Sequence, residues 1–213
     1  MIIAIDGPAA SGKGTLARKI AKDMSIPYLD TGSLYRAVGL LTLRRGGDPA
    51  DATDAISAAN ILNINDFTPD DLRTEAAGNA ASKVAAIGGV RAALLAYQRS
   101  FAARDGAAVM DGRDIGTMVC PEADAKIFVT ASLEVRVGRR IKELREKGES
   151  VNEQRVWDDM AARDARDSDR AIAPLKPADD AFVLDTSALN ADEALAAAKA
   201  FIVSKKKTQK DSA

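Results

Sequence analysis

One short stretch restricts the possible fold of this chain more than any other, the segment Gly7-Pro8-Ala9-Ala10-Ser11-Gly12-Lys13. It follows the apolar run at residues 2–5, whose lack of alternation predicts a strand buried on both faces. After it, apolar residues at three- and four-residue spacing between 16 and 24 predict an amphipathic helix that ends before Pro27. Strand, G-x-x-x-x-G-K turn and helix in this order predict a phosphate-binding loop, or P-loop.

The chemistry of this loop suits a nucleotide donor such as ATP. Its glycines allow consecutive backbone N–H groups to converge on one phosphate, the helix N-terminus adds positive charge, and Lys13 can bridge two phosphoryl groups. Gly14 follows the lysine, where most P-loops place a Mg²⁺-binding Ser or Thr. Thr15 is therefore a candidate Mg²⁺ contact through water. The candidate donor-binding residues are Gly7, Pro8, Ala9, Ala10, Ser11, Gly12, Lys13, Gly14 and Thr15.

The G-K-G-T variant of the motif resembles the nucleoside-monophosphate kinases. Further apolar runs, at residues 28–29, 107–110, 125–130 and 181–184, are separated by sequence that can form helices. This alternation predicts an α/β fold with a parallel central sheet flanked by helices. We expect a single P-loop kinase domain over residues 1–213.

Two segments depart from the alternation of strand and helix. The strand signal disappears between about residues 48 and 91, which we interpret as a small insertion that binds the acceptor. Residues 145–170 are rich in charge with a scattered apolar stripe, which indicates a helix, a loop and a short lid. Residues 205–213 are polar, and we expect this tail to be frayed.

Composition excludes several classes of function. The 31 acidic and 30 basic residues nearly cancel, so no global field favours nucleic acid or a membrane surface as a partner. Histidine is absent, which removes Ser-His and Cys-His catalysis. Cys120 is the only cysteine, so no internal disulfide can form, and the chain opens directly with a strand-like run. A cytoplasmic location is the expectation.

Four blocks of sequence lie beyond the P-loop. The first, Asp30-Thr31-Gly32-Ser33-Leu34-Tyr35-Arg36, follows the second strand, so Arg36 can face an acceptor phosphate at the ligand-binding edge of the sheet. The others are Asp111-Gly112-Arg113-Asp114-Ile115-Gly116-Thr117, the segment at 163–170 that precedes Ala173-Pro174-Leu175, and the segment at 79–85 followed by Val90-Arg91. Together they resemble the bacterial cytidylate kinases, from Ile3 to about Asp185.

The resemblance implies a role for each matching residue. The acceptor is then CMP or dCMP, with ATP as donor, Mg²⁺ as cofactor and a monomeric enzyme. Thr31 stands where the family often has serine, and residues 61–72 look shorter than in relatives that carry a small sheet there. The implied phosphate contacts are Arg36, Arg113 and Arg170, the ribose contacts Arg163 and Asp167, and the cytosine contacts Thr31, Ser82, Arg91 and Asp114. The cations assigned to catalysis are Lys13, Arg113, Arg163 and Arg170.

Three assignments have alternatives. Asp111 ends an apolar strand, the usual place for an acidic residue near Mg²⁺, where it acts through water, although a structural ion pair would have the same pattern. Arg136 and Arg140 share one helix face, which suits a contact with ATP or an ordinary solvated basic face. The remaining alternatives for function are a kinase of the same fold acting on UMP, AMP or a non-nucleotide acceptor, and a P-loop ATPase switch. A GTPase is excluded because no Asn-Lys-x-Asp motif is present.

Physical chemistry favours the kinase. Phosphoryl transfer passes through a loose transition state, so catalysis is mainly positioning and stabilisation of charge by cations. Arginine binds phosphate oxygens bidentately, and a lid can bring arginines in only when both nucleotides are bound. An ATPase switch does not need the set of arginines on the acceptor side, Arg36, Arg113, Arg163 and Arg170.

Overall fold

The computed structural model describes residues 1–211, without the side chains of Asp105 and residues 206–211. Its strands are β1 (Ile2–Asp6), β2 (Tyr28–Asp30), β3 (Ala108–Gly112), β4 (Ala125–Thr130) and β5 (Phe182–Asp185). The helices are α1 (Lys13–Met24), α2 (Thr31–Arg44), α3 (Ala52–Asn60), α4 (Glu75–Val84), α5 (Gly88–Ala103), α6 (Leu133–Glu146), α7 (Glu153–Asp169) and α8 (Ala191–Asp211). Short helical turns are η1 (Ile64–Asp66), η2 (Asp71–Arg73), η3 (Arg104–Gly106) and the π-turn η4 (Ile115–Val119).

Within the described residues the strands form one sheet in the order β2-β3-β1-β4-β5, with every neighbouring pair parallel. This confirms the predicted α/β fold with a parallel central sheet flanked by helices. All strands point their carboxyl ends to the same edge, where the P-loop follows β1 and the Asp111–Thr117 loop follows β3. Ligands of open α/β sheets bind at this edge.

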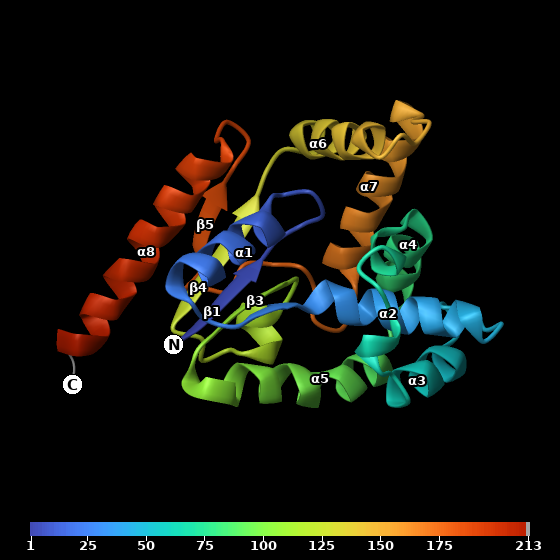
Figure 1. Ribbon diagram of the computed structural model, residues 1–213, viewed down its shortest axis with the longest axis horizontal. Helices are drawn as coiled ribbons and strands as arrows, with labels where there is room; N and C mark the ends of the chain where they lie inside the picture. The colour runs from blue at the N-terminus through green and yellow to red at the C-terminus, as the bar shows by residue number, and fades with distance from the viewer. Residues whose placement is uncertain (212–213) are drawn as a thin grey trace.

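Alternation along β1 divides the core between the two faces of the sheet. Ile3 and Ile5 belong to the cluster under α1 and α8, whereas Ala4 belongs to the cluster under α5 and η4. All three side chains are fully buried, as expected for a central parallel strand. Figure 1 shows the sheet between these layers, with α8 beyond the β5 edge and α2 to α5 gathered on the opposite side.

Local sequence signals explain where the helices begin and end. Asp30 caps α2 by accepting a hydrogen bond from the Ser33 backbone N–H at 3.2 Å, and Asn152 caps α7 through the N–H of Arg155 at 3.0 Å. Helix α1 ends at Ser25, which adopts a left-handed conformation with φ 54° before Pro27 turns the chain into β2.

The segment at 48–91 contains α3, η1, η2, α4 and the first residues of α5, and the structure describes no strand there. These helices pack on α2 around Val38, Val84, Val90 and Leu94 in a core cluster separate from those of the sheet. The boundary expected near residue 91 lies inside α5, which continues to Ala103 and reaches the sheet. The division of the chain into an acceptor insertion at 48–91 and a lid at 145–170 stays a prediction.

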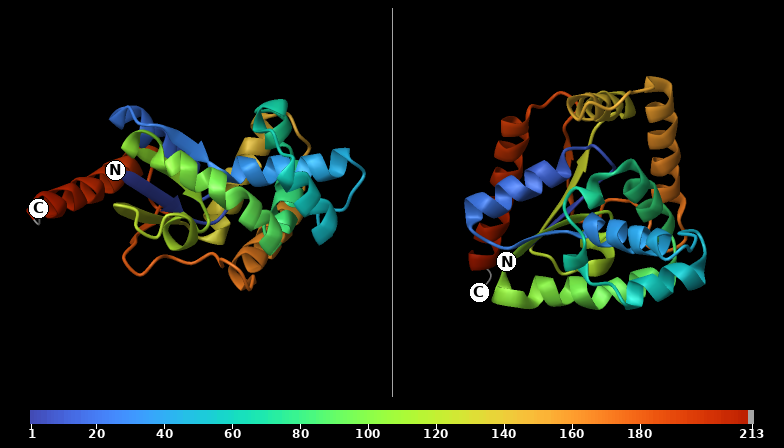
Figure 2. Two further views of the ribbon diagram at one scale, coloured as in Figure 1. Left: turned by 90° about the horizontal axis from the view of Figure 1, so that it is seen from below. Right: turned by 45° about the vertical axis from the view of Figure 1, so that its right-hand side comes forward.

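The charged segment at 145–170 contains the end of α6, a turn and the whole of α7. Figure 2 shows α6 and α7 as an arm that leaves the sheet and returns to α2 and α4. Helix α8 continues to Asp211, so the tail expected to be frayed from residue 205 is helical that far, and the last two residues lie outside the described part.

Along residues 1–211 no single helix combines the length and apolar character needed to cross a membrane. One adjoining pair, α4 with α5, reaches them together but is bent by 102° between its helices.

Candidate active site

The P-loop geometry depends on two glycines. A Cβ on Gly7 would stand 2.0 Å from the carbonyl oxygen of Val129 on the neighbouring strand, so only glycine fits there. Gly12 adopts a left-handed φ of 91° and is the N-cap of α1. No described side chain caps this helix start, so the first N–H groups of α1 remain available to a ligand's phosphate oxygens.

Lys13, the first residue of α1, lines a cleft of about 440 Å³ at the carboxyl edge of the sheet. Its amine donates a 3.3 Å hydrogen bond to the carbonyl of Pro8. Burial and repulsion from Arg113 lower the pKa of Lys13 to about 7, although Asp111 and Asp30 oppose the shift. A negatively charged ligand beside the amine would restore its proton.

Asp111, at the end of β3, is held on one side by Tyr28, whose hydroxyl donates a 2.6 Å hydrogen bond to Oδ1. The other carboxylate oxygen, Oδ2, lies 3.7 Å from the point where a Cβ on Gly14 would stand. Burial raises the pKa of Asp111, with Lys13 acting against it. Within the described chain, no three His, Cys, Asp or Glu side chains cluster closely enough to hold a metal by themselves.

Arginines from three elements converge on one part of the cleft. Arg36 on α2 pairs with Asp30 at 3.2 Å, and Arg113 after β3 donates through Nε to Asp167 on α7 at 2.9 Å. Burial opposes ionisation of Asp167, but Arg113 and Arg163 outweigh it and hold the pKa of that carboxyl below its usual range. Arg113 therefore joins the loop after β3 to helix α7 through the Asp167 carboxylate.

Two of these guanidinium groups have buried nitrogens with no hydrogen-bond partner among the described residues, Arg163 Nε and Arg170 Nη2. Burial and repulsion from Arg113 lower the pKa of Arg163 to about 10, while burial and Arg91 lower that of Arg170. Buried donors that lack a hydrogen bond and repel a neighbouring cation are costly in a folded chain. Their arrangement fits an anion that the cleft takes up.

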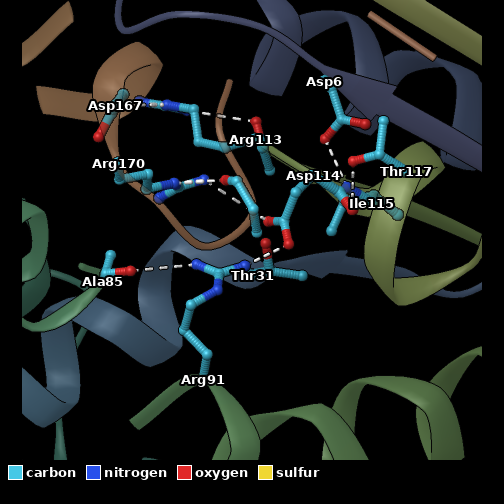
Figure 3. A network of polar contacts seen from close by, with 12 residues as sticks. Asp6, Thr31, Ala85, Arg91, Arg113, Asp114, Ile115, Thr117, Asp167 and Arg170 are labelled. Atoms are coloured by element: carbon cyan, nitrogen blue, oxygen red, sulfur yellow. Dashed lines mark hydrogen bonds and ion pairs between the residues drawn. The ribbon is translucent and has the colours of Figure 1, made fainter. Parts of the chain in front are cut away.

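A second polar group lies deeper in the cleft. Arg91 on α5 forms a buried ion pair with Asp114 and donates to the carbonyl of Ala85 at 3.2 Å (Figure 3). Its guanidinium also lies over the Tyr35 ring, 5.5 Å from the ring centroid. Arg170 approaches the other oxygen of Asp114 at 4.0 Å. A carboxylate and guanidinium groups side by side can serve complementary donors and acceptors on one ring.

Thr31 and Ser82 also face this cleft and are buried. The Thr31 hydroxyl donates to the Asp111 carbonyl at 2.8 Å, and the Ser82 hydroxyl accepts from Arg166 Nε at 3.2 Å. The predicted site residues that line the one cleft are Ala9, Ala10, Gly12, Lys13, Gly14, Thr15, Thr31, Arg36, Ser82, Arg91, Asp111, Arg113, Asp114, Arg140, Arg163, Asp167 and Arg170. Four residues of the predicted set do not line the cleft: Gly7, Pro8, Ser11 and Arg136.

The structure places Arg136 and Arg140, which were predicted to share one helix face, in different surroundings. Arg140 lines the cleft and pairs with Glu143 at 2.9 Å. Arg136 is buried, pairs with Asp164 at 2.6 Å, and donates to the carbonyls of Ala131 and Ala9 at 2.9 and 3.4 Å. These contacts support the P-loop from behind, so a direct contact of Arg136 with ATP stays a prediction without geometric support.

Sequence reasoning missed the neighbouring Arg139. Its guanidinium donates to the carbonyl of Ser11 at 3.3 Å and to the hydroxyl and carbonyl of Thr186 at 3.0 and 2.7 Å. Thr186 also donates to the Ser11 carbonyl at 3.0 Å, so together they tie the P-loop to the end of β5. The only sequence signal is a run of arginines in which position 139 carries no mark of its own. The hydrogen bond from Tyr28 to Asp111 was also missed, because nothing in the sequence marks that these two residues are in contact.

Known proteins resemble this chain over almost its whole length. The cytidylate kinase family model matches residues 3–203. Cytidylate kinase of Paramagnetospirillum magneticum is 59% identical over 208 residues, which cover 96% of this chain and 99% of that protein. Cytidylate kinase of Rhodospirillum rubrum is 59% identical over 202 residues, 93% of this chain and 95% of that protein.

Among solved structures, a gluconokinase from Sinorhizobium meliloti aligns with a TM-score of 0.53 at 14% identity, over 99% of this chain and 96% of its own. An uncharacterised protein from Eubacterium ventriosum aligns with a TM-score of 0.56 at 16% identity, over 96% and 98%. At such low identity these structures show the fold alone. The match of sequence to the family model and to its curated members decides the family, and this chain belongs to the cytidylate kinases.

Proposed function

We propose that this chain transfers the γ-phosphoryl group of ATP to CMP or dCMP and releases ADP with CDP or dCDP. The observation that carries the proposal is the set of buried guanidinium nitrogens that lack a hydrogen-bond partner among the described residues, Arg163 Nε and Arg170 Nη2, in a cleft shared with the P-loop. The chain's place in the cytidylate kinase family supplies the acceptor.

The donor occupies the P-loop end of the cleft. The free N–H groups at the start of α1 bind the β-phosphate, and Lys13 bridges the β- and γ-phosphoryl oxygens. Negatively charged phosphates beside the amine would raise its pKa from about 7, so the amine acts as a cation. Arg140 reaches the same phosphates from α6.

The acceptor phosphate lies among Arg36, Arg113, Arg163 and Arg170. Planar guanidinium groups hold its oxygens bidentately and in line with the γ-phosphoryl group. Because the transition state spreads negative charge over the moving group, fixed cations stabilise it without further reorganisation. Asp167 orients Arg113 through the 2.9 Å bond to Nε and also serves as the proposed ribose contact beside Arg163.

The base lies at the Arg91–Asp114 end, where Thr31 and Ser82 add hydroxyl groups. Cytosine presents an amino donor at C4 and acceptors at N3 and O2, whereas uracil presents an O4 acceptor and an N3 hydrogen. A carboxylate that accepts and a guanidinium that donates match cytosine. Uracil would set its O4 against Asp114 and its N3 hydrogen against a donor.

The residues around Gly14 fit a Mg²⁺ ion that is carried mainly by nucleotide phosphates. Magnesium takes one or two oxygen side chains and keeps several waters. Asp111, oriented by Tyr28, and Thr15 at the cleft mouth would hold it through water. The bound ion would neutralise charge on the phosphates.

Residues 145–170 act as the lid and residues 48–91 as the acceptor segment in this proposal. Arg155 on α7 already pairs with Glu75 on α4 at 3.0 Å, a contact that joins the two across the cleft. Closure excludes water, the competing acceptor. The monomeric state and the cytoplasmic location stay expectations.

A coupled assay that detects ADP, run with ATP and one acceptor at a time, tests the function. The expected result is a kcat/KM for CMP and dCMP at least about tenfold above that for UMP or AMP. A higher kcat/KM for UMP, AMP or a non-nucleotide acceptor would show that CMP and dCMP are not the preferred acceptors. ADP release that is unaffected by every acceptor would indicate an ATPase switch.

A further inference from the structure

Asp6 is a buried carboxylate at the end of β1, directly before the P-loop, and the proposed mechanism gives it no task. Its Oδ1 accepts a 2.8 Å hydrogen bond from the backbone N–H of Ile115, and its Oδ2 accepts one of 2.8 Å from Gly116 (Figure 3). These two peptide groups come immediately after Asp114. Asp6 therefore joins the start of the donor loop to the loop that carries the base contact.

The Asp6 end of this connection is rigid. Asp6 lies in the central strand, paired with Gly112 of β3 on one side and Phe128 of β4 on the other. Gly7, next in the chain, lies so close to β4 that a Cβ there would stand 2.0 Å from the Val129 carbonyl oxygen. The carboxylate is thus a fixed reference point at the edge of the sheet.

The Asp114 end depends on that reference. The Asp114 carbonyl accepts from the N–H groups of Met118 and Val119 at 2.8 and 3.2 Å, which closes the π-turn η4 on one side. Asp6 holds the other side, through the two N–H groups that follow Asp114. Both peptide planes beyond Asp114 are fixed in this way, and with them the direction in which its side chain leaves the backbone.

A carboxylate is required for this arrangement. Two consecutive N–H groups each need an acceptor, and an asparagine at position 6 could supply one oxygen while turning an N–H₂ against the other donor. Burial raises the pKa of Asp6 to about 7 against the effect of both N–H bonds, and Asp114 adds to the rise. An aspartate is present at position 6 although burial disfavours its ionised form. We attribute this to the need for two acceptor oxygens facing the N–H groups of Ile115 and Gly116.

We propose that Asp6 is a positioning residue for acceptor recognition, whose carboxylate fixes the Ile115 and Gly116 backbone and so holds Asp114 in the orientation that reads the base. The inference rests on the proposed function, because it assumes that Asp114 contacts cytosine. The inference predicts that a substitution of Asp6, next to the P-loop, alters selectivity for the base of the acceptor nucleotide.

The test compares Asp6→Asn with Asp124→Asn. Asp124 also accepts a backbone hydrogen bond at β1, from the Ile2 N–H at 2.6 Å, but at the strand end away from the cleft. For Asp6→Asn we expect KM for CMP to rise about tenfold and the CMP to UMP ratio of kcat/KM to shrink about tenfold, the effect of misplacing one buried hydrogen-bonding group. KM for ATP should stay within about twofold. Asp124→Asn should lower the melting temperature and leave the ratio unchanged.

A second variant approaches the same contact with every charge retained. A Cβ on Gly116 would lie 3.2 Å from Lys126 Cδ, a tight contact, and 3.5 Å from Asp6 Oδ2, an ordinary one. Gly116→Ala therefore crowds the Lys126 stem and displaces the Gly116 backbone whose N–H Asp6 holds. It should shrink the CMP to UMP ratio in the same direction, even if Asp6→Asn does not fold. An unchanged ratio in a folded variant, or equal losses for CMP, UMP and ATP, would overturn the inference. Failure of the wild-type chain to use CMP would instead remove the proposed function.

Discussion

Replacing Asp114 with asparagine keeps the shape of the side chain and removes its charge. Asp114 and Arg91 expose only 6% and 10% of their side chains, and losing one partner of such a buried pair costs about 3 to 5 kcal/mol. The amide oxygen can still accept from Arg91, and the Tyr35 ring still covers the guanidinium, so we expect a smaller loss of about 1 to 3 kcal/mol. For a chain of this size that lowers the melting temperature by about 3 to 10 °C.

The kinetic effect of Asp114→Asn separates base reading from ion pairing. If Asp114 accepts from the cytosine amino group, the variant loses one matched hydrogen bond with CMP and can donate its amide to O4 of UMP. The CMP to UMP ratio of kcat/KM should then shrink by about ten- to a hundredfold, one buried group's worth of discrimination. The assay measures kcat/KM for both nucleotides at saturating ATP.

Asp164→Asn is the matched control. It breaks the 2.6 Å pair with buried Arg136, a contact outside the cleft, and should lower stability without changing the ratio. If Asp114→Asn loses stability but both nucleotides suffer alike, Asp114 is only the partner of Arg91, and the base-reading argument is wrong.

Four further variants test the cleft and the contacts that support it. Lys13→Ala should abolish detectable transfer while calorimetry gives a CMP dissociation constant within about threefold of wild type, since the lysine serves the donor; loss of CMP affinity would contradict this. Because burial lowers the pKa of Lys13 from 10.5 to about 7 in the folded chain, its ammonium destabilises the fold most below pH 7 and least above pH 10.5. Lys13→Ala should therefore unfold at a higher urea concentration than wild type at low pH, a difference that shrinks as the pH rises; urea titrations at both ends of this range check the sign. Arg113→Lys and Arg170→Lys should each lower kcat by about ten- to a hundredfold and raise KM for CMP less, and full activity in either would reject the bidentate role. Arg139→Lys should raise KM for ATP several-fold and leave KM for CMP unchanged, because it loosens the P-loop at Ser11; equal changes in both would place the residue elsewhere.

The sequence was sufficient for the elements whose signal is local. The strand at 125–130 was predicted with the bounds of β4, and the turn at 7–13 required glycine for reasons visible in the motif itself. The parallel sheet followed from alternation alone. Residue roles at the acceptor end came from resemblance to a family, because the sequence alone does not show where an arginine side chain points.

Contacts between distant segments could not be predicted. Arg136 and Arg140 lie one helical turn apart, so the sequence predicted a contact with ATP equally for both. In the structure Arg136 instead pairs with Asp164 on α7 and donates to the carbonyl of Ala9 in the P-loop. Asp6 is another case: its two bonds to Ile115 and Gly116 span 109 and 110 residues of chain. Only the strand order of the sheet brings these residues together.

The central claim is that the γ-phosphoryl group of ATP passes directly to the acceptor phosphate in one cleft. A single-turnover reaction with γ-labelled ATP, enzyme in excess and CMP present, measures the fate of that group. The account predicts that the label appears in CDP, that little appears as inorganic phosphate, and that omitting CMP leaves the label on ATP. Label released as inorganic phosphate at the same rate with and without CMP would contradict it.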